Sequence, residues 1–458
     1  MTTAATPPAG AGAAALSRST AALLGLLGVG SALAVGDLVA GLVSPPASPF
    51  LAVGNQFIRI TPEPLKQFAI AAFGVYDKLV LLSGMGLVVA VLGVVAGLAG
   101  RRRVVHGVAV VVAMGLVAGW CAMLSPTFTA VDLLPPLASL LVGVAVFAVL
   151  HRFLLAAGRR AGDRPVAAAA GGVARRRALL LAGGVAAGSL VAAVAGRLVG
   201  GAGAVEESRK AVGPLTAGPA PPRIPAGADF AALGTPTLIT RNEDFYRVDV
   251  ALQVPQLRTA DYSLRVHGMV DRELNLTFDQ LRARRLIEAP ITQTCVSNEI
   301  GGYLMSTSMF LGAPLADLLA EAGVRPGAEQ LFSTSVDGYT TGVPVPAVTD
   351  GRDAMLAIGM NGEPLPAEHG FPVRMIVPGI YGYLSGCKWL TDIEVTTWDA
   401  RQGYWQQRGW AREAPVKTQS RIDVPRRDAR VPAGRVVLAG TAWAQHTGID
   451  RVEVRADG

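Results

Sequence analysis

The sequence predicts a two-part membrane protein: an all-α bundle of five transmembrane helices, then a mixed α+β domain and a short β-rich segment. Three observations favour this. The 458 residues are 51% hydrophobic and 16% charged, whereas soluble domains carry about 25% charged residues. Long apolar runs are confined to the first 200 residues. From Thr235 onward, short strand-like runs alternate with turns and helix-like segments.

Five apolar runs in residues 1–200 are long enough to span a bilayer, which needs about 20 residues. Charged side chains are rare within them, with Asp37 in the first run and Arg197 near the end of the fifth. The predicted spans are Ala21–Val43, Leu79–Gly100, Val104–Leu124, Leu133–Ala157 and Ala178–Gly200.

Basic residues are concentrated in the apolar part of the chain. Residues 1–200 hold 15 Lys and Arg against 5 Asp and Glu, and residues 201–458 hold 26 against 29. The folded C-terminal part therefore has no net basic character to favour a nucleic-acid partner. The arginines cluster between spans two and three and between spans four and five. By the positive-inside rule we expect these loops and the N-terminus in the cytoplasm, and everything after residue 200 outside it.

The fifth run follows three consecutive arginines, Arg175, Arg176 and Arg177. Two interpretations stay open. The arginines are either an ordinary positive-inside anchor or a twin-arginine signal, which exports proteins that have already folded.

Residues 201–234 are rich in Gly, Pro and Ala and predict a semi-rigid extended linker. Residues 235–415 then form the mixed domain. Its predicted strands include Leu264–Val266 and Val373–Val377, and its predicted helices include Thr277–Ala283 and Pro314–Ala322.

Residues 416–458 contain only strand and turn signals, with Arg435–Leu438 and Val452–Arg455 as β-rich runs. A β-sandwich needs about 100 residues. We therefore expect the start of a second β domain, in a chain that stops inside it.

Cys295 lies in a polar, glycine-flanked segment, Thr292–Gly302. A cysteine in such a loop can be a nucleophile, a metal thiolate or a buried structural residue, and the local sequence leaves all three open. Three cysteines are too few for a disulfide framework. No pair of Cys or His has the spacing of a zinc site.

Basic residues near glycine-rich turns follow further along, in His369–Arg374, Val377–Gly382 and Lys388. Arginine forks and backbone N–H groups suit a phosphate. Taken alone, this pattern is weak, because Gly-Pro turns are common.

Taken together and in order, these motifs resemble the molybdopterin-binding domain of the sulfite oxidase family, over about residues 235–458. The motifs are Arg241-Asn242, Cys295 with Asn298, Leu311–Leu315, Ser335–Tyr339, Asn361–Leu365, His369–Arg374 and Lys388–Leu390. The tail looks like the opening of the family's immunoglobulin-like dimerisation domain, on Ser420–Pro425, Gly440–Trp443 and Gly448–Val454.

The resemblance implies an oxidoreductase whose molybdenum is held by one pterin dithiolene and by the Cys295 thiolate. It places Asn298 and Trp410 with Cys295 in the catalytic site. By matching position, the pterin and its phosphate would be held by Arg241, Asn242, Asp337, His369, Arg374 and Lys388. Two alternatives stay open: Asp337 caps the turn at Gly338, and His369 bonds only to backbone.

Two departures bear on the substrate. Ile300 stands where sulfite-oxidising members have an arginine, and Trp410 where they use a tyrosine. Because an apolar residue binds a dianion poorly, reduction of a small S-oxide or N-oxide is the first hypothesis. Sulfite oxidation is the alternative, favoured if an arginine such as Arg241 enters the pocket. A binding module without cofactor is the third, against which the intact Cys295 argues.

The family's pterin is inserted in the cytoplasm, so an exported domain favours the twin-arginine interpretation of Arg176 and Arg177. The expected electron partner is a cytochrome or the quinone pool, and a homodimer is a further expectation. His106 and His151, on different spans at the cytoplasmic side, also give a minor hypothesis of a bis-histidine haem b.

Overall fold

The computed structural model describes residues 15–73, 76–125, 127–162, 168–199, 202–218, 220, 222–299 and 301–455. The chain divides into two compact units, Met1–Ala202 and Gly203–Gly458. Each unit has its own cluster of buried apolar side chains.

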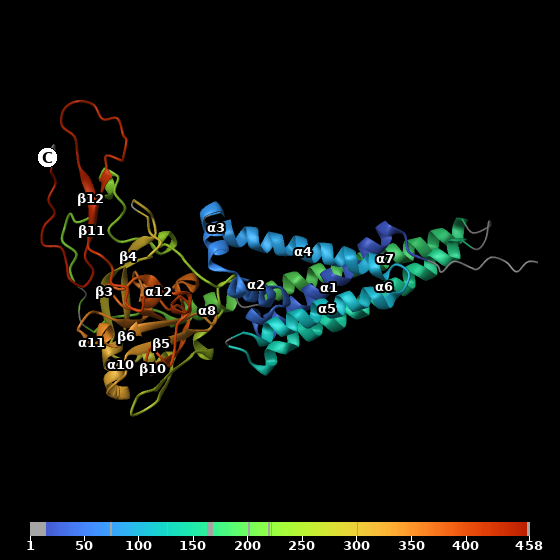
Figure 1. Cartoon of the computed structure of the whole chain (residues 1–458), viewed down its shortest axis with the longest axis horizontal. Coiled ribbons are helices and arrows are strands. Elements are labelled where there is room, and N and C mark those ends of the chain that lie inside the picture. Colours follow the sequence, from blue (N-terminus) through green and yellow to red (C-terminus); the bar gives the residue numbers. More distant parts are fainter. Residues whose placement is uncertain are drawn as a thin grey trace, which may run out of the picture. The chain divides into compact units, whose positions relative to one another are not determined.

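The first unit is a bundle of long helices (Figure 1). Its α-helices are α1 (Arg18–Val43), α2 (Pro49–Ile60), α3 (Glu63–Phe73), α4 (Asp77–Gly100), α5 (Val104–Met123), α6 (Leu134–Gly162) and α7 (Ala168–Val199). Helices α2 and α3 lie between the first two predicted spans.

Among the described residues, four helical stretches are long and apolar enough to cross a membrane. They are Arg18–Val43, Asp77–Gly100, Val104–Met123 and Ala130–Ala156, which match the first four predicted spans. The fifth predicted span falls in α7, where the apolar stretch Leu180–Gly196 is shorter, and its last residue, Gly200, lies outside the described residues. The fifth span stays a prediction.

Small residues let α1 and α4 approach at backbone distance. A Cβ atom on Gly97 would lie 1.8 Å from the Ala21 carbonyl oxygen, and one on Gly25 would lie 1.8 Å from the Gly93 carbonyl oxygen. Within lipid no hydrophobic effect drives helices together, so small residues that allow close van der Waals packing are typical of helix interfaces there.

The two histidines of the haem hypothesis differ in their surroundings. His151 is buried beside Phe147, and its Nε2 lies 2.8 Å from the Gly100 carbonyl oxygen. His106 is exposed at the start of α5. One ring nitrogen of His151 is thus already engaged with backbone, and the haem hypothesis remains untested.

The second unit is an α+β domain, as predicted. Its strands are β1 (Ser263–Gly268), β2 (Leu274–Thr277), β3 (Ile287–Thr294), β4 (Met305–Pro314), β5 (Gln330–Ser335), β6 (Thr340–Pro344), β7 (Met355–Met360), β8 (Glu363–Pro364), β9 (Arg374–Ile376), β10 (Leu390–Thr396), β11 (Gln419–Val424) and β12 (Ala439–Trp443). Its α-helices are α8 (Ala202–Val212), α9 (Phe278–Arg282), α10 (Leu315–Ala322), α11 (Pro346–Thr349) and α12 (Gly382–Ser385).

Two five-stranded sheets carry the site. One has the order β2-β1-β10-β5-β6, with β1 and β10 parallel and the other pairs antiparallel. The other has the order β3-β4-β7-β8, with β9 also paired to β7. The predicted strands at 264–266 and 373–377 and both predicted helices are confirmed within the bounds above.

Local signals explain the helix ends. The Thr277 side chain caps α9 by accepting from the Gln280 N–H, as Thr does at N-caps. Gly323, in the left-handed region at φ 70°, ends α10.

Two expectations need correction. The first part of the expected extended linker is helix α8, and its Val205 and Val212 are buried in the core of this unit. The β-rich runs at 435–438 and 452–455 are not strands; instead β11 pairs with β12 in a two-stranded sheet. Strand propensity needs a partner, and β12 begins one residue after the first run.

Candidate cofactor site

Cys295 follows directly after β3, at the start of a loop that hydrogen bonds close. The Cys295 N–H donates to the Leu304 carbonyl at 2.9 Å, and the Asn298 N–H donates to the Cys295 carbonyl at 3.0 Å. The Asn298 side chain accepts from the Leu304 N–H at 2.9 Å. Asn298 therefore shapes the loop that presents the thiol. Ile300, in the same loop, lies outside the described residues.

The Cys295 thiol is partly buried. Burial raises its pKa above the usual value, and hydrogen bonds from Ser297 act in the opposite direction. A thiol in such a place is deprotonated when a soft metal cation binds it.

Arg374, at the start of β9, is a buried cation with 4% of its surface exposed. Its Nη1 donates to the His369 carbonyl at 3.1 Å, and its Nη2 donates to Gln293 Oε1 at 2.7 Å. Burial lowers its pKa to about 10, so it stays charged at neutral pH.

This guanidinium is incompletely satisfied. Arg374 Nε and Gln293 Nε2 are buried and have no hydrogen-bond partner, and no carboxylate among the described residues pairs with Arg374. Leaving a buried charge unpaired is costly. The pair therefore forms a donor site for an anionic group.

His369 closes a turn that ends at Gly370. Its Nε2 donates to the Asn242 carbonyl at 2.9 Å. Burial and the nearby Arg374 lower the pKa of His369, which favours the neutral ring. Gly370 has φ 109°, and a Cβ there would lie 3.0 Å from the Cβ of Arg374 and 3.1 Å from the Cβ of Lys388. The turn thus brings His369, Arg374 and Lys388 together.

Lys388 donates to Asp249, whose side chain is fully buried, and lies 4.8 Å from the Trp389 ring centroid. Trp389 has φ 49°, which is rare for a bulky residue, and its indole N–H donates to the Ala367 carbonyl at 2.8 Å. Together these residues hold the turn before His369, and Lys388 shares the Asp249 carboxylate with Arg247.

Two other predicted residues, Arg241 and Trp410, make their side-chain contacts outside this network. Arg241 has 71% of its side chain exposed and pairs with Glu243 and Asp244. Asp337 accepts from the Tyr339 N–H at 3.0 Å, as a turn cap does. Trp410 stacks on Trp405, with the ring centroids 4.3 Å apart. Asn242 does belong to the network, through its carbonyl and its side chain.

Sequence reasoning missed several residues of the site. Gln293 lies two residues before Cys295, inside the segment that drew attention to the thiol. Tyr246 is half-buried and within electrostatic reach of Cys295 and Arg374, and burial raises the pKa of its hydroxyl. From the C-terminal segment, Arg421 donates to the Gly302 carbonyl at 2.8 Å, and Gln445 donates to Thr294 Oγ1 at 3.3 Å. No local pattern signals these long-range contacts.

Comparison with known proteins decides the family. A family model described as "Oxidoreductase molybdopterin binding domain" matches residues 251–405. Sulfite oxidase of Gallus gallus is 32% identical over 265 residues, which cover 48% of this chain and 57% of that protein. The uncharacterized oxidoreductase YuiH of Bacillus subtilis is 30% identical over 171 residues, which cover 35% of this chain and 83% of that protein.

The chain belongs to the sulfite oxidase family of molybdopterin-dependent oxidoreductases. It spans about half the length of the curated sulfite oxidases that it matches. The solved sulfane dehydrogenase SoxCD of Paracoccus pantotrophus is 26% identical, with a TM-score of 0.39, and the match covers 45% of this chain and 58% of that chain.

The molybdenum cofactor of this family fits the residues present. Cys295 supplies a soft ligand, and the unpartnered donors of Arg374 and Gln293 match an anionic group such as a phosphate. The predicted cofactor is therefore supported both by family membership and by the chemistry of the site.

Proposed function

We propose that the protein is a membrane-anchored molybdenum oxidoreductase that reduces a small S-oxide or N-oxide outside the cytoplasm. The observation that carries the proposal is the buried, unpaired guanidinium of Arg374. Arg374 lies at the start of β9, in the same sheet as β3, which leads directly into Cys295. When bound, the molybdenum–pterin centre supplies two-electron oxygen-atom transfer. The oxide would take up two electrons and two protons, and would leave as the reduced compound and water.

In this proposal the protein's own residues hold the metal and the pterin in place. The Cys295 thiolate would ligate the metal, within a loop that Asn298 holds in shape. Arg374 and Gln293 would donate to the anionic end of the pterin. His369 donates its Nε2 proton to the Asn242 carbonyl, so in the neutral ring Nδ1 remains a hydrogen-bond acceptor.

Charge balance favours a neutral substrate. Arg421 contacts the Cys295 loop, but Asp423 lies 2.8 Å from its Nε. Arg241, which would have favoured sulfite had it entered the pocket, pairs instead with two exposed carboxylates. A dianion would thus find Arg421 and Arg241 already paired with carboxylates.

Sulfite oxidation is the second candidate. It is supported by the 32% identity to a sulfite oxidase and by the hydrogen bond from Arg421, in β11, to Gly302 in the Cys295 loop. In that direction the two electrons would leave the site instead of entering it.

We further propose five membrane spans, a cytoplasmic N-terminus and an exported catalytic unit, with α7 as the fifth span. The arginine-rich loops and the apolar stretch of α7 support this topology. A cytochrome or the quinone pool would exchange electrons with the site. The segment after residue 415, including β11 and β12, would belong to an immunoglobulin-like domain that forms a homodimer.

The test combines metal analysis with a panel of substrates. Molybdenum and pterin would be measured in the purified full-length protein, and sulfite, S-oxides and N-oxides would be assayed with a redox dye. We expect about one molybdenum per chain and oxide-dependent dye oxidation, both lost in Cys295→Ser. Cys121→Ser, which removes a thiol from α5, is the control and should keep both.

Each other outcome contradicts a stated part of the proposal. Sulfite-dependent dye reduction without oxide turnover would replace the first candidate by the second. A folded protein without molybdenum or pterin would instead favour a cofactor-free binding module.

A further inference from the structure

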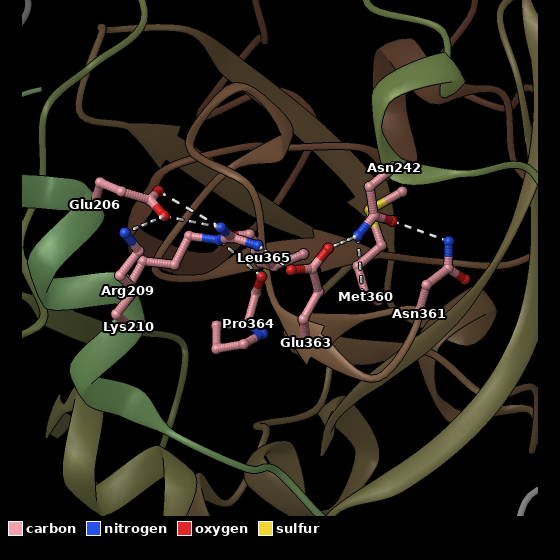
Figure 2. Close-up of polar contacts among 9 residues, drawn as sticks. All are labelled: Glu206, Arg209, Lys210, Asn242, Met360, Asn361, Glu363, Pro364 and Leu365. Atoms are coloured by element: carbon pink, nitrogen blue, oxygen red, sulfur yellow. Dashed lines mark hydrogen bonds and ion pairs between the residues drawn. The ribbon is translucent and has the colours of Figure 1, made fainter.

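Helix α8 is held on the catalytic unit by the buried Val205 and Val212, by Ser208, whose hydroxyl accepts from the Thr259 N–H at 3.0 Å, and by Arg209. Arg209 Nε donates to the carbonyls of Pro364 and Leu365, each at 3.1 Å, and Nη2 lies 2.6 Å from Glu363 Oε2 (Figure 2). The Arg209 side chain is 16% exposed, whereas that of its neighbour Lys210 is 75% exposed. Arg209 therefore makes contacts that an ordinary surface residue of a linker does not make.

Glu363 also bonds to a residue of the cofactor site, Asn242. Its second oxygen, Oε1, accepts from Asn242 Nδ2 at 2.6 Å, and Asn242 Oδ1 accepts from Asn361 Nδ2 at 2.9 Å (Figure 2). Each carboxylate oxygen of Glu363 thus serves one partner, with Arg209 on one side and Asn242 on the other.

Asn242 is also the residue that orients His369. Its carbonyl accepts from His369 Nε2, and the His369 carbonyl accepts from Arg374. A continuous chain of polar contacts therefore runs from Arg209 through Glu363, Asn242 and His369 to Arg374. Chains of this kind fix side-chain orientation more firmly than separate bonds do.

The network also borders open space. A cavity of about 800 Å³ is lined by Arg209, Asn242, Asn361, Glu363 and Glu368, among others. Because Glu363 is about half exposed, its carboxylate could turn to water if Arg209 did not hold it. Asn242 Nδ2 would then lose its shorter hydrogen bond, 2.6 Å to Glu363, and keep only the 3.3 Å bond to the Met360 carbonyl.

We propose that Arg209 is a positioning residue of the cofactor site and that it makes helix α8 part of the cofactor cradle. The inference rests on the proposed function. It gives the segment that joins the two units a direct effect on how firmly the cofactor is held.

The experiment uses full-length protein in detergent and two measurements, hydrogen exchange of the α8 amides and the rate of molybdenum loss during dialysis. In Arg209→Ala we expect exchange in α8 to rise about tenfold or more, because several bonds to a charged group are lost. Molybdenum loss should be several-fold faster. Arg209→Lys keeps the charge beside Glu363 and should restore most of the retention.

Two further variants separate the contacts. Glu363→Gln keeps one oxygen acceptor but removes the charge, and we expect intermediate retention. Lys210→Ala, on the exposed side of the same helix, is the matched control and should equal the wild type. If Arg209→Ala does not fold, Glu363→Gln still tests the network, because it must lose molybdenum faster than the Lys210→Ala control.

The outcomes distinguish the two proposals. Faster α8 exchange with unchanged molybdenum loss would mean that Arg209 stabilises α8 without affecting the cofactor, and would overturn the inference. Unchanged exchange in Arg209→Ala would overturn it as well. Absence of molybdenum from the wild type would overturn the proposed function instead.

Discussion

At Arg374 the protein keeps a guanidinium under the surface without a carboxylate to balance it. Two of its nitrogens bond to protein oxygens and the third has no partner. Arg352 provides the contrast within the same unit. Its side chain is 8% exposed, yet it pairs with Asp350 at 2.5 Å and donates to the Pro378 carbonyl. One buried arginine is structurally complete, and the other has a donor left for a ligand.

This contrast gives a prediction. Arg374→Gln should lower molybdenum content at least tenfold, because a charged contact to a ligand is worth about 1.5–3 kcal/mol or more. The melting temperature of the cofactor-free protein should fall only slightly, because removing the unpaired charge offsets the lost bonds. Arg352→Gln should do the reverse, lowering the melting temperature while molybdenum content is kept. Metal analysis and thermal unfolding decide, and equal molybdenum loss in both variants would contradict the assignment.

The sequence predicted some single residues of the site where they belong to a recognisable motif. His369, Arg374 and Asn242 came from ordered motifs and lie in one network. Arg241 came from the same motif as Asn242, and Trp410 was placed by matching position, yet neither contacts that network among the described hydrogen bonds and ring contacts. A motif cannot tell which way each side chain points, whereas the burial of Arg374 is a property of the folded unit.

At the scale of elements, α4 has glycines of two kinds. Gly97 is in backbone contact with α1, whereas a Cβ on Gly84 would meet nothing within 4 Å. Composition alone makes the two equivalent, because both are small residues in one apolar run.

The structure therefore predicts opposite effects for one substitution. Gly97→Ala should destabilise the bundle by about 1–3 kcal/mol, because the helices must separate. Gly84→Ala should be neutral or stabilise by up to about 1 kcal/mol through helix propensity. Thermal unfolding in detergent, followed by intrinsic fluorescence, measures both. The α1–α4 contact would be disproved by equal melting temperatures.

Helix α8 shows why composition misjudged an element. Its Gly, Ala and charged residues predict a linker, but Val205 and Val212 are covered by partners far away in the sequence. A short helix is unstable alone, so its presence depends on that tertiary contact. The strand β12 likewise depends on β11 as its partner.

At the scale of the whole molecule, the open question is how the catalytic unit reaches its compartment. The proposed route uses Arg176 and Arg177 at the start of the fifth span. Lysine keeps the positive charge that sets topology but does not replace arginine in a twin-arginine signal.

Arg176→Lys with Arg177→Lys should therefore leave the catalytic unit in the cytoplasm. Arg102→Lys with Arg103→Lys, in the loop after α4, conserves charge in the same way and should not alter export. Protease accessibility in spheroplasts measures the location in a host with the twin-arginine pathway. An exported unit in the first variant would contradict this route and favour a plain anchor.

The sequence by itself determined the two-part organisation, the first four helices long and apolar enough to cross a membrane, and the family, because apolar run length and ordered motifs are local properties of the chain. Only the tertiary structure decided which predicted residues meet. It joined Asn242, His369 and Arg374 with the unpredicted Gln293, and it tied α8 to them through Arg209 and Glu363. These contacts span up to 154 positions along the chain, so no short window of sequence contains both partners. Burial then left one of several similar arginines, Arg374, with a donor that has no partner among the described residues.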